Sequence, residues 1–193
     1  MQSTIRFCLF VTLAFCVKGV QGATPSWGAE GSRAKGMVTI VPDAEIQSVL
    51  APAPTEAVAD HVLRVVPIDG EYNVGVSVVR RIKVDGKTPP DAILHHEITE
   101  IYSVLSGSGI LVTGGTIEGE TELPANDPIV RTLVGPTTVG KAIVGGTRQQ
   151  IGPGDIVVIP PNTAHGFIEI KSAEITYEVV RVDPHRVLSQ HDR

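Results

Sequence analysis

The sequence predicts an all-β protein, an antiparallel sandwich or barrel preceded by one short helix. Nearly everything past residue 61 consists of short runs rich in valine and isoleucine, with turn signals between them. The 193 residues include 20 glycines and 14 prolines, as a chain with many turns requires. Short strands spaced in this way are typical of sandwiches and barrels.

Residues 1–22 are predicted to be a secretory signal peptide. Arg6 supplies a positive charge, and the apolar run over residues 7–17 is too short to span a bilayer. Small residues precede Ala23, where a signal peptidase would cleave. We therefore expect an exported protein, periplasmic or extracellular, with no membrane span after processing. A membrane anchor that stays attached is the alternative.

Cysteine content and charge limit the chemistry of the mature chain. Cys8 and Cys16 both lie in the predicted signal peptide, so neither a disulfide framework nor a thiol nucleophile is expected. The net charge of −5 would become −7 once the two basic residues of that segment are removed. Nucleic acid binding needs a clustered positive face, so the charge argues against a nucleic-acid partner.

The next segment, residues 23–60, is predicted to be an arm with a short helix. Residues 38–41 predict a short strand. Asp43 is a suitable cap for a helix over residues 44–50. Residues 51–60, rich in alanine and proline at their start, predict a loop.

Residues 61–182 are predicted to form the barrel, and residues 183–193 a polar, peripheral tail. The candidate strands lie within residues 61–68, 73–84, 99–115, 129–134, 141–161 and 165–182.

Two histidine-containing stretches carry the candidate chemistry. The first, "HHEITE", holds His95, His96, Glu97 and Glu100, and the second, "GDIVVIPPNTAHGF", holds His165. Only a folded sheet could bring groups so far apart in the chain to one point. Imidazole and carboxylate groups together are typical ligands of transition metals.

The spacing of these stretches resembles the two motifs of the cupin superfamily. The first motif places a glycine seven residues after a glutamate, as Glu100 and Gly107 are placed here. The second has a glycine, a proline and a histidine at the spacing of Gly154, Pro160 and His165.

The second motif departs from the family at two positions. Asn162 stands where the family has a glycine, and asparagine also tolerates a positive φ. Glu169 replaces the asparagine that usually ends the motif. The resemblance covers roughly residues 60–182. It implies a cupin double-stranded β-helix, that is, a jelly-roll barrel, and a possible homodimer.

The first motif supplies one histidine where metal-binding cupins usually have two. Leu94 or Ile93 occupies the position of the missing one, depending on whether His96 or His95 is the histidine retained. Neighbours in a strand point to opposite faces, so both histidines cannot face inward without a bulge. The sequence "TEIYSVLSGSGILVTGG" resembles a cupin subgroup with a single histidine and favours His95, with His96 as the alternative.

This resemblance implies a metal site formed by His95, Glu100 and His165. Two histidines and one carboxylate leave open positions on iron(II), and the set also suits manganese, nickel or zinc. We therefore expect one divalent transition metal and favour dioxygenase-like iron(II) chemistry on a small organic molecule. The alternatives are a non-catalytic cupin that holds a metal or small ligand, a metal-independent isomerase or epimerase with a histidine as base, and a vestigial, empty pocket.

Other residues have less specific predictions. Tyr102 shares strand parity with Glu100, and Phe167 with His165, so both are candidates to line a substrate pocket, with core packing as the alternative. A solvated strand face is favoured over an anion site for Arg80, Arg81 and Lys83. Residues expected to be exposed are Glu97, His61, His185 and His191.

Overall fold

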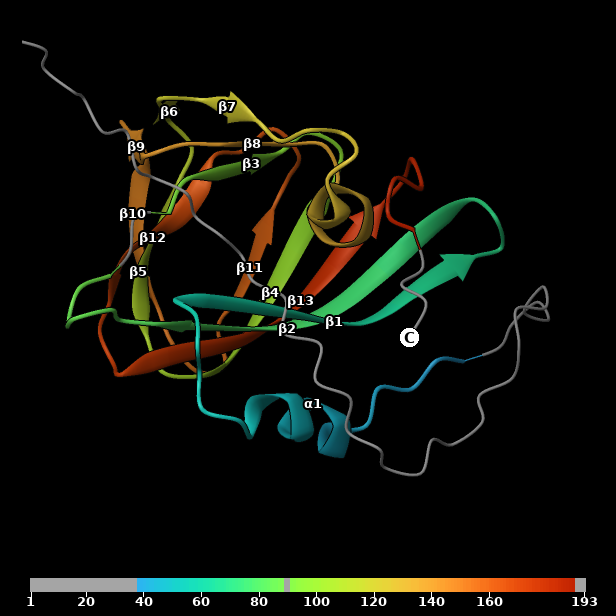
Figure 1. Cartoon of the computed structure of the whole chain (residues 1–193), viewed down its shortest axis with the longest axis horizontal. Coiled ribbons are helices and arrows are strands. Elements are labelled where there is room, and N and C mark those ends of the chain that lie inside the picture. The colour runs from blue at the N-terminus through green and yellow to red at the C-terminus, as the bar shows by residue number, and fades with distance from the viewer. Residues whose placement is uncertain (1–37, 89–90, 190–193) are drawn as a thin grey trace, which may run out of the picture. The chain divides into compact units, whose positions relative to one another are not determined.

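The computed structural model describes residues 38–88 and 91–189 (Figure 1). These residues contain the helix α1 (Asp43–Leu50), the single-turn π-helix η1 (Val130–Val134) and thirteen strands. The strands are β1 (Val58–Ile68), β2 (Tyr72–Ile82), β3 (Ile93–His95), β4 (Thr99–Ser106), β5 (Gly109–Thr113), β6 (Thr116–Glu118), β7 (Thr121–Glu122), β8 (Thr137–Val139), β9 (Ala142–Val144), β10 (Thr147–Ile151), β11 (Ile156–Ile159), β12 (His165–Ile170) and β13 (Glu174–Asp183). Among the described residues no helix has the length and apolar character needed to cross a membrane.

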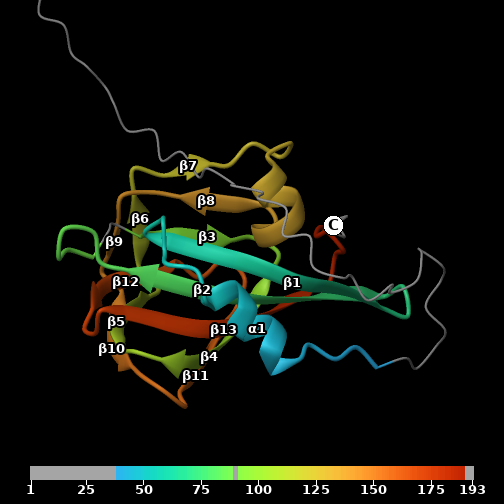
Figure 2. The ribbon, with the colours of Figure 1, turned by 60° about the horizontal axis from the view of Figure 1, so that its bottom comes forward.

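The strands form two large antiparallel sheets and one small ribbon. The five-stranded sheet has the order β1-β2-β13-β4-β11, and the six-stranded sheet has the order β10-β5-β12-β3-β8-β7. The ribbon pairs β6 with β9. Strands that are distant in the sequence lie side by side, as β13 does between β2 and β4. The predicted all-β double-stranded β-helix with a short helix before it is confirmed (Figures 1 and 2).

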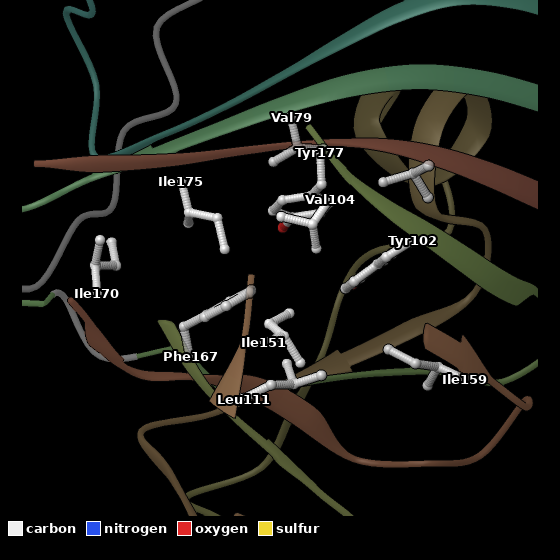
Figure 3. Packing of buried hydrophobic residues seen from close by; sticks show 11 residues of the cluster. Val79, Tyr102, Val104, Leu111, Ile151, Ile159, Phe167, Ile170, Ile175 and Tyr177 are labelled. Atoms are coloured by element: carbon white, nitrogen blue, oxygen red, sulfur yellow. The ribbon is translucent and has the colours of Figure 1, made fainter. Parts of the chain in front are cut away.

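The hydrophobic core lies between the two large sheets (Figure 3). Strands of the five-stranded sheet contribute Val79, Tyr102, Val104, Ile159, Ile175, Tyr177 and Val179. The six-stranded sheet contributes Leu111, Ile151, Phe167 and Ile170. Burial of apolar surface of this kind contributes roughly 25 cal/mol per Å² to folding, so the core holds the two sheets face to face.

Strand β13 shows the alternation that places side chains in this interior. From Tyr177 onward every second residue is buried, and the residues between are only partly buried. The inward row continues past the apolar part of the strand to Arg181 and Asp183. The strand therefore carries two charged side chains into the interior.

The residues before the barrel differ from prediction at three points. Residues 38–41 form no strand, and Val38 and Ile40 are largely exposed. Helix α1 has Pro42 at its N-cap, so the prediction that Asp43 caps it is wrong. Asp43 is instead the first helical residue, and its carboxylate accepts a hydrogen bond from Gln47. The apolar side of α1 packs on the outer face of β1 and β2 through Ile46 (Figure 2).

Strand β1 begins at Val58, inside the segment predicted to be a loop. Val58, Ala59 and Asp60 pair with Arg81, Arg80 and Val79 of β2. The polar Asp60 is accommodated in the strand because its carboxylate forms an ion pair with the buried Arg181.

The strand predicted over residues 129–134 is wrong, because this segment forms η1. Its buried side chains, Val130, Leu133 and Val134, follow a helical spacing of i, i+3 and i+4. Asp127 accepts a hydrogen bond from the backbone N–H of Ile129 and so stabilises the preceding turn. A short apolar run satisfies both helical and strand patterns, and packing against the barrel decides between them.

The C-terminal segment is not wholly peripheral, which corrects the prediction for residues 183–188. Asp183 is buried at the end of β13 and accepts hydrogen bonds from the backbone N–H groups of Val187 and Leu188. Leu188 is buried, and its carbonyl accepts a hydrogen bond from Asn73 of β2. The predicted tail is therefore tied to the five-stranded sheet.

Two glycines in turns give a test of this packing. Gly107 and Gly70 both have positive φ, at 73° and 77°. A Cβ at Gly107 would lie 2.0 Å from the carbonyl oxygen of Glu174, whereas a Cβ at Gly70 would meet nothing within 4 Å. We expect Gly107→Ala to lower the free energy of unfolding by about 3–5 kcal/mol and Gly70→Ala by about 1–2 kcal/mol. Urea denaturation measures both, and equal losses would contradict the packing described at Gly107.

Candidate metal centre

Three polar side chains meet at one place between the two sheets. His95 ends β3 and His165 begins β12, and these strands are paired in the six-stranded sheet. Glu100 comes from β4 of the facing sheet. Oε2 of Glu100 lies 3.4 Å from Nε2 of His95 and 3.2 Å from Nε2 of His165. One ligand atom from each residue lies within 4.8 Å of the others, so the group has the geometry to hold a metal ion.

The site is almost completely shielded from solvent. The side chain of His95 is 4% exposed, and those of Glu100 and His165 are each 2% exposed. Charged and polar groups buried to this degree are costly unless they are paired or bind a metal.

Of the two adjacent histidines, His95 is the one that points inward. His96 lies on the other side of the chain with about a third of its side chain exposed. Its Nδ1 contacts Oδ1 of Asn162, and its Nε2 contacts Thr138 and Glu122. As expected, the two neighbouring side chains therefore point to opposite faces without a bulge, and His96 belongs to a surface cluster. The neighbouring Glu97 is partly buried rather than exposed.

Hydrogen bonds fix both inward rings in the tautomer that a metal ligand needs. Nδ1 of His165 lies 2.9 Å from the backbone carbonyl of Thr163, which can only accept, so Nδ1 carries the proton. Nδ1 of His95 lies 2.9 Å from Oγ1 of Thr137, whose hydroxyl donates to the carbonyls of Val134 and Gly135. That hydroxyl oxygen therefore accepts from His95, and in the neutral form of either ring the lone pair lies on Nε2, which faces Glu100.

The charges around the site favour the metal-binding protonation states. Burial raises the pKa of Glu100, but the neighbouring His95 and Arg181 outweigh it, so this pKa lies well below its ordinary value. Burial lowers the pKa of His95, and the facing carboxylate of Glu100 offsets that only in part. The permanent charge of Arg181 thus favours the ionised carboxylate, and burial favours the neutral ring of His95, as metal ligation requires.

One ring nitrogen of the site is buried without a hydrogen bond, although a carboxylate oxygen lies beside it. The nitrogen is Nε2 of His165, and the oxygen is Oε2 of Glu100. Most buried polar atoms have a partner, so each exception needs an explanation. A cation between the two Nε2 atoms and Oε2 would satisfy this lone pair, and two imidazoles with one carboxylate suit a divalent transition metal.

The two predicted pocket residues are both buried in the core. The hydroxyl of Tyr102 donates a hydrogen bond of 2.9 Å to Oε2 of Glu100, so this residue contacts the site directly. Its ring stacks on Tyr177 at a centroid distance of 4.6 Å. Phe167 packs among the core residues, with the guanidinium of Arg81 5.3 Å from its ring centroid (Figure 3).

The solvated face predicted for the basic residues of β2 is wrong for both arginines. Arg81 points into the barrel, where it forms an ion pair of 2.7 Å with Asp91 and donates to the hydroxyl of Tyr177. Arg80 points to the other face and donates to the carbonyls of Leu50 and Pro52 behind α1. Both guanidinium groups are largely shielded from solvent and have protein acceptors nearby. Lys83 is partly buried.

The remaining histidines have separate environments. His61 on β1 is partly buried, which corrects the expected exposure, and burial lowers its pKa. His185 is exposed, as predicted. His191 lies outside the described residues.

Sequence reasoning missed the residues that support the site. Arg181 binds Oε1 of Glu100, and Asp60 and Ser77 bind Arg181 in turn. Strand parity could have found Arg181, because it shares the inward row of β13 with Val179. Thr137 gave no comparable signal, since its contact with His95 depends on the path of the chain after η1.

Comparisons with known proteins find one family match over part of the chain and several distant structural likenesses. Residues 139–193 match the family model of the AraC-like ligand binding domain. No curated protein matches the chain. The DMSP lyase DddQ from Ruegeria pomeroyi DSS-3 is 17% identical over 65% of this chain and 46% of that chain, with a TM-score of 0.39. The present chain thus spans less than half of that lyase.

Two further solved structures are similar over most of their own length. KdgF from Halomonas sp. is 14% identical over 69% of this chain and 87% of that chain, with a TM-score of 0.39. A Klebsiella pneumoniae protein with a double-stranded beta-helix domain is 14% identical over 69% of this chain and 86% of that chain, with a TM-score of 0.38. The double-stranded β-helix is defined by the chain's own strand order rather than by these likenesses.

The hydrogen bond between Thr137 and His95 leads to a prediction. Thr137→Val keeps the shape of the side chain but removes the acceptor of the Nδ1 proton, which frees the His95 ring to change tautomer. We expect zinc affinity to fall about 10–100-fold, as for other ligand-supporting residues. Competition with a chromogenic chelator measures it. Thr138→Val is the matched control, since the hydroxyl of Thr138 contacts the outward His96 and Glu122. Equal affinities of the two variants would contradict the assigned tautomer.

Proposed function

We propose that this chain is an exported, metal-dependent cupin that acts on a small organic molecule, with iron(II) dioxygenase-like chemistry favoured. His95, Glu100 and His165 would hold one divalent transition metal. The observation that carries the proposal is Nε2 of His165, which is buried without a hydrogen bond and faces the same carboxylate oxygen as Nε2 of His95. Export rests on the pattern of residues 1–22, which lie outside the described residues.

The net charge of the site also supports a bound cation. Asp60, Arg181 and Glu100 form one connected set of ion pairs, with two negative charges and one positive charge. Burial lowers the pKa of His95, so the ring of His95 does not balance the surplus. A buried charge without compensation costs several kcal/mol, and a divalent cation beside Glu100 would supply the compensation.

The protein groups around the metal position have defined roles. When bound to two histidines and a carboxylate, iron(II) offers open positions for a substrate and for O₂. Burial and the nearby Glu100 raise the pKa of Tyr102 well above its ordinary value, so its hydroxyl keeps its proton and remains a donor. Ile159 is buried opposite Glu100 in the sheet register and belongs to the apolar surroundings that exclude bulk water.

A second candidate function is a non-catalytic module that binds a small ligand or a metal. The near-complete burial of the three ligand side chains favours it, because an enzyme must admit its substrate. The family model matched by residues 139–193 is that of a ligand binding domain. In this case the same three residues would hold a metal without turnover.

The ligand set has a direct mutational test. We expect the mature protein, purified without a histidine tag, to carry about one equivalent of a transition metal. His165→Ala should remove nearly all of the metal, because only two ligands remain. The barrel should stay folded. His96→Ala should retain the metal, since that ring binds surface partners. Elemental analysis with circular dichroism measures both properties, and full metal occupancy in His165→Ala would rule out the ligand assignment.

Oxygen uptake then separates the candidate functions. An iron-loaded protein that consumes O₂ with a small organic substrate, and loses this activity in His165→Ala, supports the enzyme. Tight binding of a small molecule without turnover supports the second candidate. Turnover that survives complete removal of metal by a chelator would overturn the metal-dependent mechanism in favour of an isomerase or epimerase.

A further inference from the structure

Arg181 is a buried arginine that joins three strands at the candidate metal centre. Its Nε donates to Oε1 of Glu100 on β4 at 2.8 Å, and its Nη1 donates to Ser77 on β2 at 2.8 Å. Its Nη2 donates to Oδ2 of Asp60 on β1 at 2.6 Å. The side chain is 4% exposed. Since every nitrogen has an acceptor on a different strand, the guanidinium is held in one orientation.

The sheet register places this arginine at the carboxylate. Arg181 of β13 lies opposite Glu100 on one side and Gly75 of β2 on the other. A Cβ at Gly75 would lie 3.3 Å from Cβ of Arg181 and 3.4 Å from Leu188. The missing side chain at Gly75 therefore leaves room for Arg181 where the strands are closest.

The two oxygens of Glu100 consequently have different partners. Oε1 is engaged by Nε of Arg181, on the side away from the histidines. Oε2 accepts the hydroxyl of Tyr102 and faces both Nε2 atoms. A carboxylate held in this way presents Oε2 to the metal position and keeps Oε1 turned toward Arg181.

Stability alone does not account for this arrangement. Buried ion pairs can often be replaced by apolar side chains without loss of stability, because desolvation offsets the attraction. Here the network also leaves Oδ1 of Asp60 buried without a hydrogen-bond partner. The benefit that the geometry does explain is the fixed orientation of Glu100.

We propose that Arg181 is a positioning residue that makes Glu100 a one-oxygen ligand and so keeps a coordination position open for an exogenous molecule. This inference rests on the proposed metal site. Without Arg181, Oε1 would be buried without its strongest donor, and an unsatisfied buried acceptor is costly. Oε1 would then turn to the metal, and the carboxylate would bind through both oxygens.

Cobalt(II) substitution tests this role, since its visible absorption reports coordination number. In Arg181→Met we expect the cobalt bands to weaken relative to wild type, because an extra oxygen ligand raises the coordination number. We also expect the affinity for azide, a probe for an open coordination position, to fall by about tenfold or more. Should Arg181→Met fail to fold, the double variant Asp60→Asn/Arg181→Met removes the partner charge as well and carries the same test.

Arg80→Met is the matched control. Arg80 is also buried, but it donates to the backbone carbonyls of Leu50 and Pro52 on the outer face of the sheet. Its loss should lower stability and leave the cobalt spectrum and azide affinity unchanged.

The outcomes separate this inference from the metal site itself. A wild-type protein that takes up no cobalt overturns both. If wild type binds cobalt and Arg181→Met has the same spectrum and azide affinity, the metal site stands and Arg181 has only a structural role. Equal spectral changes in Arg80→Met and Arg181→Met would also overturn the positioning role, because they would reflect general loosening. A folded Arg181→Met protein that takes up no cobalt would overturn the one-oxygen role, because the proposal expects this variant to retain the metal through both oxygens of Glu100.

Discussion

The buried carboxylate of Glu100 is the interaction on which the arrangement of the barrel interior depends. An ionised carboxylate away from water is costly, and here four groups from other residues surround it. Arg181 and Tyr102 donate hydrogen bonds to it, and the rings of His95 and His165 face its second oxygen. The pKa of Glu100 remains well below its ordinary value despite burial, so these partners hold it in the charged form.

The two-sheet architecture supplies these partners because neither sheet contains all of them. The five-stranded sheet provides Glu100, Tyr102 and Arg181, and the six-stranded sheet provides His95 and His165. The shared apolar core between the sheets sets their separation and with it the distances at the site. Substitutions in the core would therefore alter the distances between the ligand atoms, even where no ligand residue is replaced.

Much of the site could be predicted from the sequence because alternation and motif spacing report which side chains face inward. Strand alternation allows only one of His95 and His96 to face inward, and the resemblance to a cupin subgroup favours His95, which is the buried one. Other residues depend on tertiary contacts that a pattern does not record. Arg81 was expected on a solvated face, but Asp91 and Tyr177 provide acceptors inside the barrel. Similarly, the run at residues 129–134 fits a strand until packing selects η1.

We expect a metal ion between Nε2 of His95, Nε2 of His165 and Oε2 of Glu100. Anomalous diffraction from crystals of the metal-loaded protein, collected on both sides of the metal's absorption edge, would locate it. We predict one peak about 2.0–2.2 Å from each of the three atoms. A peak instead beside His96 and Glu122, or none between the three atoms at full metal content, would contradict it.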